Sequence, residues 1–115
     1  MILFRLGAIS AASAVAASAF ASHGLDKRVK STEWRRHFRT AVNSHLTGAL
    51  GTMLAAAMVP RFPRASFGAA LLLAGHLVFA GSVYVNSIYE ERKLRGVAPI
   101  GGFCLIAGFA ALAFI

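Results

Sequence analysis

Four long apolar runs, divided by short charged or proline-containing connections, most constrain what this chain can fold into. The runs cover about residues 2–22, 41–59, 65–89 and 98–115, and Arg5 is the only Lys, Arg, Asp or Glu within them. A membrane-spanning helix needs about 20 mostly apolar residues, and lipid offers no partners for backbone polar groups, which favours helices. The sequence therefore predicts an all-α membrane protein, a single domain over residues 1–115 with four transmembrane helices in two antiparallel hairpins.

Composition excludes several classes of protein. Of the 115 residues, 57% are hydrophobic and 14% are charged, whereas soluble domains average about 25% charged residues. Four spans would occupy most of the chain, so no soluble catalytic domain fits beside them. The alternating short strands of a membrane β-barrel are missing from the sequence.

The first run has two interpretations. A charge near its start, an apolar stretch and the sequence Ala19-Phe20-Ala21 resemble a cleavable signal peptide. The run is also long enough to cross a membrane at about 1.5 Å per residue, and the Arg5 side chain can extend to the interface. We expect this run to form the first span.

The polar connection before the second run is interpreted as the start of a helix. Ser31 is a suitable N-cap, and Glu33 falls in the first turn, near the positive end of the helix dipole. Trp34 and Phe38 are four residues apart and share a helical face that suits the membrane–water boundary. We expect residues 32–39 to form an interfacial turn or two leading into the second span, with a solvated basic loop as the alternative.

Proline and glycine mark the remaining boundaries. Pro60 and Pro63 bracket a tight turn between the second and third runs, and Pro99 suits the first turn of the last helix. Gly24 and Gly96 are expected to terminate the first and third spans.

Basic residues are concentrated on one side of the expected helices. The first and third connections hold nine of them: Lys27, Arg28, Lys30, Arg35, Arg36, Arg39, Arg92, Lys93 and Arg95. The other side holds Arg5, Arg61 and Arg64. The positive-inside rule places the first and third connections in the mitochondrial matrix or the cytoplasm, and both termini on the opposite side. The expected location is the mitochondrial inner membrane, with the bacterial plasma membrane as the alternative. This bias accounts for the net charge of +8 without nucleic-acid binding.

Small residues recur along every run at spacings that allow helices to approach closely in lipid. The helix-packing candidates are Gly7, Ser10, Ala14, Ser18, Gly48, Gly75, Ser82, Gly101, Gly102 and Gly108. In the first run, Ser10, Ala14, Ser18 and Ser22 form a stripe at spacing four. These seams predict a compact helical bundle and give weaker support for a partner protein.

Three histidines are the polar candidates within the membrane: His23, His45 and His76. Ionisable groups in spans are functional candidates by default. A bis-histidine haem would need strong helix tilt, because counting from the expected boundaries places His45 and His76 roughly 8 Å apart in depth at 1.5 Å per residue. We expect these side chains instead to hydrogen-bond neighbouring helices or interfacial water, with no metal or cofactor.

No enzymatic motif is visible. The carboxylates Asp26, Glu33, Glu90 and Glu91 all lie in charged connections, and the sequence contains no phosphate-binding glycine loop, His-Glu-x-x-His motif or nucleophile elbow. Cys104 is the only cysteine and has no partner for an internal disulfide. A non-enzymatic protein is expected.

Three stretches resemble one known family. Leu6-Gly7-Ala8 with Phe20-Ala21-Ser22-His23-Gly24-Leu25, Phe79-Ala80-Gly81-Ser82-Val83-Tyr84, and Val97-Ala98-Pro99-Ile100-Gly101-Gly102 are similar, in order and spacing, to motifs of the transmembrane protein 256 family. The resemblance covers nearly the whole chain. It implies a small four-helix membrane protein of bacteria or mitochondria, and it brings no assigned activity and no ligand residues.

These features favour a non-enzymatic packing protein, an accessory subunit of a larger inner-membrane assembly of the respiratory type. A small oligomeric channel or carrier is one alternative, and a histidine-ligated haem or redox module is another. Other membrane subunits and membrane lipids are the expected partners, cardiolipin among them. The candidate headgroup ligands are Arg35, Arg36, Arg39, Arg92 and Lys93.

Overall fold

The computed structural model describes residues 1–94 and 96–115. Within this part of the chain there are five helices and no strands: α1 (Ile2–His23), α2 (Leu25–Arg28), α3 (Thr32–Met58), α4 (Ala65–Tyr89) and α5 (Ala98–Leu112). The prediction of an all-helical fold is confirmed. Arg95, one of the nine basic residues counted above, lies outside the described residues.

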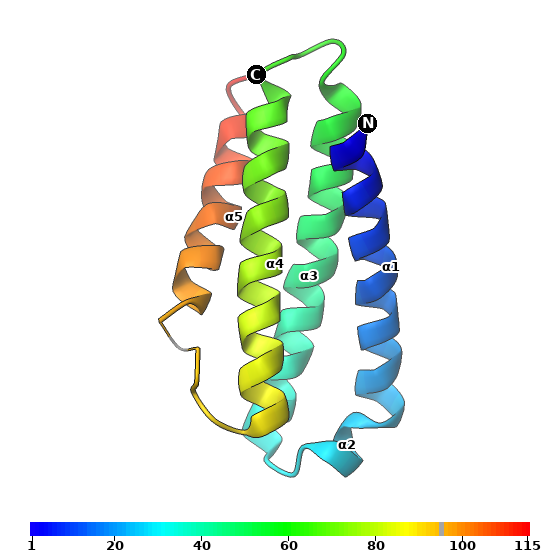
Figure 1. Cartoon of the computed structure of the whole chain (residues 1–115), viewed down its shortest axis with the longest axis vertical. Helices are drawn as coiled ribbons and strands as arrows, with labels where there is room; N and C mark the ends of the chain where they lie inside the picture. The colour runs from blue at the N-terminus through cyan, green and yellow to red at the C-terminus, as the bar shows by residue number, and fades with distance from the viewer. Residues whose placement is uncertain (95) are drawn as a thin grey trace.

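The four long helices lie in a row in the order α1, α3, α4 and α5, and neighbours run antiparallel (Figure 1). Each helix packs against the next in this order, while α1 and α4, like α3 and α5, touch little. The principal extents are 47, 27 and 18 Å, so the arrangement is thinner than it is wide. Both termini lie at one end of the helix bundle, the top of Figure 1, and α2 lies at the opposite end.

The helix boundaries follow the apolar runs closely. α4 covers the predicted range, and α3 runs without a break from Thr32 into the second apolar run, which excludes the loop alternative for residues 32–39. The Ser31 hydroxyl caps α3 by accepting a hydrogen bond from the Trp34 N–H at 3.4 Å. Pro99 lies in the first turn of α5, as expected. The short helix α2 was not predicted, and its Leu25 is fully buried.

Length and composition alone identify two candidate membrane spans, α1 and α4. α5 ends at Leu112 rather than at residue 115, and its 15 residues rise only about 22 Å at 1.5 Å per residue. In α3 the apolar segment contains Asn43, His45 and Thr52, which lower its hydropathy. Two of these three side chains, His45 and Thr52, are buried within the protein.

The expectation that Gly96 terminates the third span is wrong. α4 ends seven residues earlier at Tyr89, and Glu90 adopts the left-handed conformation at φ 52°. This geometry is normally taken by glycine. Here the Glu90 carboxylate offsets its cost by accepting a hydrogen bond from the Ser31 N–H at 2.8 Å. Gly24 does follow the end of α1, but at φ −121° it does not use the left-handed conformation.

Two apolar clusters lie at different heights in the row. One contains Ala21, Leu25, Val29, Phe38 and Val42, near α2, and the other contains Ala55, Ala69 and Leu72. On α3, His45 lies between Val42 of the first cluster and Ala55 of the second. On α4, His76 lies between Leu72 of the second cluster and Tyr84, which packs against the first. The core is therefore an apolar, polar, apolar sequence of layers.

Glycine allows close helix contact at several points. A Cβ at Gly48 would overlap the Cβ of His76, and a Cβ at Gly101 would overlap the backbone of Phe79. Further contacts pair Gly7 with Met53, Gly51 with Phe109, Gly68 with Leu112, Gly75 with Cys104 and Leu105, and Gly108 with Leu72. Gly102 makes only ordinary contact with the Phe79 ring, and Ser82 is buried with its hydroxyl donating to the Phe79 carbonyl at 3.0 Å.

The buried face of α1 differs from the predicted stripe. Gly7, Ser10, Ala14 and Ala21 are buried, whereas Ser18 is exposed and does not belong to this face. A spacing of four advances about 40° around a helix at each step, because 3.6 residues complete one turn. Alternating steps of three and four residues stay on the side that meets a neighbouring helix. Ser18 and Ser22 therefore turn away from the contact that Ser10 and Ala14 make.

We predict that Gly101→Ala destabilises the protein by about 1–3 kcal/mol, because the new methyl group meets the Phe79 backbone, which cannot move aside cheaply. Gly102→Ala is the matched control, since its methyl group would lie 3.7 Å from the Phe79 ring. The measurement is the free energy of unfolding in mixed detergent micelles. Equal free energies for the two variants would contradict the close approach of α4 and α5.

Candidate functional site

A chain of buried hydrogen bonds joins α1, α3 and α4. The Ser10 hydroxyl lies 3.0 Å from His45 Nε2 and 2.7 Å from His76 Nε2. His45 Nδ1 lies 2.8 Å from the Tyr84 hydroxyl, and His76 Nδ1 lies 2.7 Å from the Leu72 carbonyl oxygen. We call the four side chains, Tyr84, His45, Ser10 and His76, the histidine chain.

The direction of every hydrogen bond in the histidine chain follows from one end. The Leu72 carbonyl can only accept, so His76 Nδ1 carries a proton, and Nε2 of the neutral ring accepts from the Ser10 hydroxyl. Ser10 has a single proton, so its oxygen accepts the N–H of His45 Nε2. His45 Nδ1 then accepts from the Tyr84 hydroxyl. With both rings neutral, the two histidines hold opposite tautomers, and all four ring nitrogens are hydrogen-bonded.

The prediction that His45 and His76 lie roughly 8 Å apart in depth is wrong. Their ring centroids are 5.7 Å apart, and the rings stack at an interplanar angle of 24°. The contact between Gly48 and His76 sets the register of α3 against α4. His45 precedes Gly48 by three residues, or about 4.5 Å of helix rise. Depth counted from loop positions misses this register, because it assumes that both helices begin at the same level.

The arrangement does not match an axial haem site. Two axial imidazoles must direct one nitrogen each at a central iron from opposite sides. Here both Nε2 atoms point to the Ser10 hydroxyl, and the rings face each other. In the described residues no three His, Cys, Asp or Glu side chains are grouped as a metal site would require. The donor set therefore gives no structural argument for a bound metal or haem.

Several sequence candidates take other places. His23 is exposed at the end of α1 and does not join the histidine chain. Ser10, proposed only as a small packing residue, is the hydroxyl that links the histidines. The hydrogen bond of Tyr84 could not be predicted from the sequence, because its partner His45 lies 39 residues away. Within the described residues, Ser87 Oγ is the only buried side-chain nitrogen or oxygen that lacks a partner.

An apolar groove of about 300 Å³ opens beside the histidine chain. Leu6, Ile9, Ser13, Leu73 and Leu77 line it together with Ser10 and His45. Ser10 and His45 are only 6% and 8% exposed. The histidine chain therefore contributes little polar surface to the groove.

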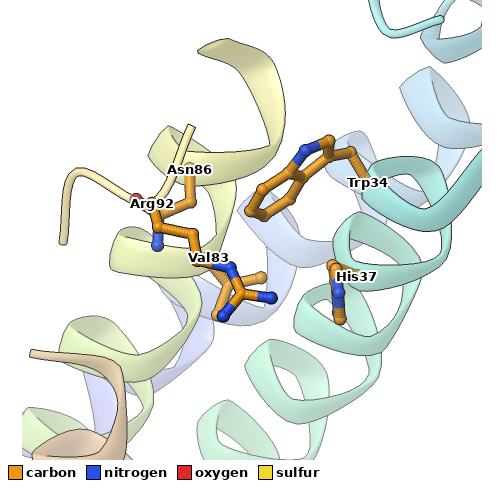
Figure 2. Close-up of a pocket in the computed structure, with 5 residues that line it drawn as sticks. All are labelled: Trp34, His37, Val83, Asn86 and Arg92. Carbon is orange, nitrogen blue, oxygen red and sulfur yellow. The ribbon is translucent and has the colours of Figure 1, made fainter. Parts of the chain in front are cut away.

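The basic residues predicted to bind lipid headgroups gather at the end of the helix bundle that holds α2. Arg35 pairs with Asp26 at 3.1 Å, and Lys93 lies 3.8 Å from Glu91. Arg39 donates to the Ala21 carbonyl at 3.3 Å. Arg36 and Arg92 are exposed. Arg92 lines a pocket with Trp34, which was not foreseen from the sequence (Figure 2).

Known proteins that are similar to this chain in sequence are membrane proteins. UPF0382 membrane protein YwdK of Bacillus subtilis is 31% identical over 91% of this chain and 87% of its own length. A UPF0382 membrane protein of Schizosaccharomyces pombe is 27% identical over 97% of this chain and 98% of its own length. A UPF0382 membrane protein of Haemophilus influenzae is 31% identical over 95% of this chain and 88% of its own length. No solved structure matches the chain.

The fold and these relatives define the chain as a small helical integral membrane protein. Residues 17–102 match the model of a protein family of unknown function, DUF423. The chain belongs to the DUF423 family. This agrees with the resemblance to the transmembrane protein 256 family, since both describe small membrane proteins without an assigned activity.

We predict that Ser10→Ala destabilises the fold by about 1–3 kcal/mol for each polar atom that it leaves unpaired, here His45 Nε2 and His76 Nε2. Ser13→Ala is the control, because Ser13 is exposed and donates only to Ile9 of its own helix. Unfolding of the protein by a denaturing detergent gives the free energy of unfolding. The ¹⁵N chemical shifts of the imidazole nitrogens report the tautomers of His45 and His76. Matching stabilities for the two variants, or identical tautomers in the wild type, would refute the assigned hydrogen bonds.

Proposed function

We propose that this protein is a four-span, non-enzymatic accessory subunit of a larger inner-membrane assembly. α1, α3, α4 and α5 are the four spans, and both termini lie on the non-matrix or non-cytoplasmic side. α1 is a retained span in this proposal, because it supplies Ser10 to the histidine chain and Gly7 to the contact with α3. The membrane is the mitochondrial inner membrane or, as the alternative, the bacterial plasma membrane.

One observation carries the assembly proposal: a polar groove on the outer surface between α1 and α3. Its cavity is about 230 Å³, and Ser18, Ser22, Arg39 and Asn43 line it together with Ala21 and Val42. Thr47, one turn beyond Asn43 on α3, is also exposed. Exposed Ser, Thr and Asn side chains on a span favour association with another helix, which supplies the hydrogen-bond partners that lipid lacks.

In this proposal the groove lies within the membrane, because α1 and α3 are both spans. If Arg39 lies at the headgroup boundary, Asn43 and Thr47 lie about 6 and 12 Å deeper, at 1.5 Å per residue. Ser18, predicted as a packing residue, serves in this proposal on a partner surface rather than on the contact between α1 and α3. The short α5 fits a four-span arrangement if the bilayer thins locally beside it.

The absence of enzymatic activity is part of the same proposal. The polar atoms of the histidine chain are hydrogen-bonded to one another and to the Leu72 carbonyl. Each of the four carboxylates has a cation or a backbone N–H near it, as in the pair of Glu33 with His37 Nε2 at 3.5 Å. The proposed partners are other membrane subunits and membrane lipids, including cardiolipin.

To test the assembly, a tagged chain is purified from its own membrane in mild detergent and run on a native gel, and the bands are identified by mass spectrometry. We expect a high-mass complex that Asn43→Leu removes, because the change deletes the amide at the groove. Leu54→Ala, at an exposed α3 position outside the groove lining, is the control and leaves the complex intact. Wild type running only as a free monomer would overturn the proposal.

A small oligomeric proton channel or carrier is the second candidate, favoured by the connectivity of the histidine chain. If His76 gains a proton at Nε2, the three hydrogen bonds that join Tyr84, His45, Ser10 and His76 can reverse, and Tyr84 becomes an acceptor. A proton can thus move between Tyr84 and His76, which are eight residues or about 12 Å apart along α4. Beyond His76 the histidine chain ends at the Leu72 carbonyl. A proton path across the whole membrane therefore needs water or a second copy of the protein.

The channel candidate predicts proton flux into reconstituted liposomes, at least tenfold slower for Tyr84→Phe because the phenolic proton is lost. Tyr89→Phe, at the exposed end of α4, is the control. A pH-sensitive dye inside the liposomes follows the flux. Flux from wild-type protein no faster than from empty liposomes would eliminate this candidate and leave the accessory-subunit proposal in place.

A further inference from the structure

A pocket of about 240 Å³ opens between the start of α3 and the end of α4, at the end of the helix bundle where the basic residues gather. Trp34, His37, Val83, Asn86 and Arg92 line it. Figure 2 shows the Arg92 guanidinium reaching between the two helices toward His37, with the Trp34 ring forming another wall. We call this the Trp34–Arg92 pocket.

The segment that carries Arg92 is held in place at both ends. Glu90 accepts a hydrogen bond from the Ser31 N–H at 2.8 Å, which fastens the segment to the start of α3. The Asn86 side chain accepts from the Leu94 N–H at 2.9 Å, and the Asn86 carbonyl accepts from the Glu91 N–H at 3.0 Å. A binding group on a fastened segment loses less entropy when a ligand orders it.

Arg92 has no carboxylate partner within ion-pair distance among the described residues, although the chain contains four carboxylates, all of them described. Asp26 lies 3.1 Å from Arg35, and Glu91 lies 3.8 Å from Lys93. Glu33 lies 3.5 Å from His37 Nε2. Glu90, as described above, accepts from the backbone. The guanidinium therefore faces a pocket with its charge uncompensated.

The geometry points to a binding site for a phosphoryl anion in the Trp34–Arg92 pocket, with Arg92 as its ligand. A guanidinium presents paired N–H groups that match phosphate oxygens. Trp34 places an indole ring beside them, and tryptophan favours the depth of lipid headgroups. The site deepens the proposed lipid partnership. It rests on the four-span arrangement, which puts this end at the membrane boundary, but not on the larger assembly.

An anionic phospholipid supplies the fitting anion at this position. Its headgroup carries a phosphate and net negative charge, and the surrounding surface holds an excess of lysine and arginine. A zwitterionic headgroup also has a phosphate, but it brings a cation into the same basic region. The anionic headgroup is therefore expected to bind more tightly.

The single tryptophan of the chain makes the occupancy of the pocket directly measurable. The full-length protein is reconstituted in two kinds of phosphatidylcholine vesicle. One contains brominated phosphatidylglycerol and the other contains brominated phosphatidylcholine at the same mole fraction, with the bromine on the acyl chains in both. Bromine quenches indole fluorescence at short range. We expect stronger quenching by the anionic lipid, and an apparent affinity about fivefold to tenfold lower for Arg92→Gln. Lys30→Gln removes an exposed positive charge from the same end of the protein, outside the pocket lining, and retains the preference.

Each outcome separates the possibilities. Equal quenching by the two lipids, or the same preference in Arg92→Gln as in wild type, overturns the site but leaves the four spans and the assembly standing. Quenching by neither lipid overturns the site together with the placement of Trp34 at the membrane. Added inorganic phosphate distinguishes the sources: if it abolishes the Arg92-dependent preference, the phosphoryl site takes free phosphate, and if it has no effect, the site takes the lipid. Circular dichroism and gel filtration verify that the variants fold.

Discussion

Buried polar atoms in this membrane protein must find partners inside the protein, and one hydroxyl supplies the partner for two helices. Ser10 donates to His76 and accepts from His45, so α1 connects α3 and α4 at a single point. Between membrane helices hydrophobicity contributes little, because lipid is as apolar as the helix surface. Hydrogen bonds and close packing then determine how the helices lie. The carbonyl of Leu72 fixes the direction of the whole histidine chain, since it can only accept.

α5 is attached by a different kind of contact. Its buried residues are Gly101 and Gly108, which lie against Phe79 and Leu72 of α4. No side-chain hydrogen bond joins it to another helix in the described residues. The attachment of α5 thus depends on steric fit, whereas α1, α3 and α4 combine polar pairing with close glycine contacts at Gly7 and Gly48. Changes that enlarge a glycine should therefore act in both parts of the row, and changes that remove a polar atom mainly at α1, α3 and α4.

Much of the fold could be predicted because apolar runs and caps are local signals. The limits of α4 and the Ser31 cap follow from residues that are adjacent in the sequence. The contact between His45 and His76 could not be predicted, because it depends on the register that Gly48 sets between two helices. The exposure of Ser18 depends in the same way on how α1 meets α3. Gly96 resembled a helix terminator, yet α4 ends at Tyr89, where Glu90 takes the left-handed conformation and its carboxylate accepts a hydrogen bond from the distant Ser31 N–H.

The few acidic residues account for the character of the basic end. The chain has 12 Lys and Arg but only 4 Asp and Glu, and those four hold local structure at that end. Asp26 lies between Arg35 and Arg39, and Glu90 fastens the segment after α4 to α3. Because four carboxylates cannot neutralise twelve lysines and arginines, the remaining positive charge stays uncompensated within the protein. A surface of this kind is complementary to an anionic membrane leaflet, which is the physical basis of the proposed lipid site.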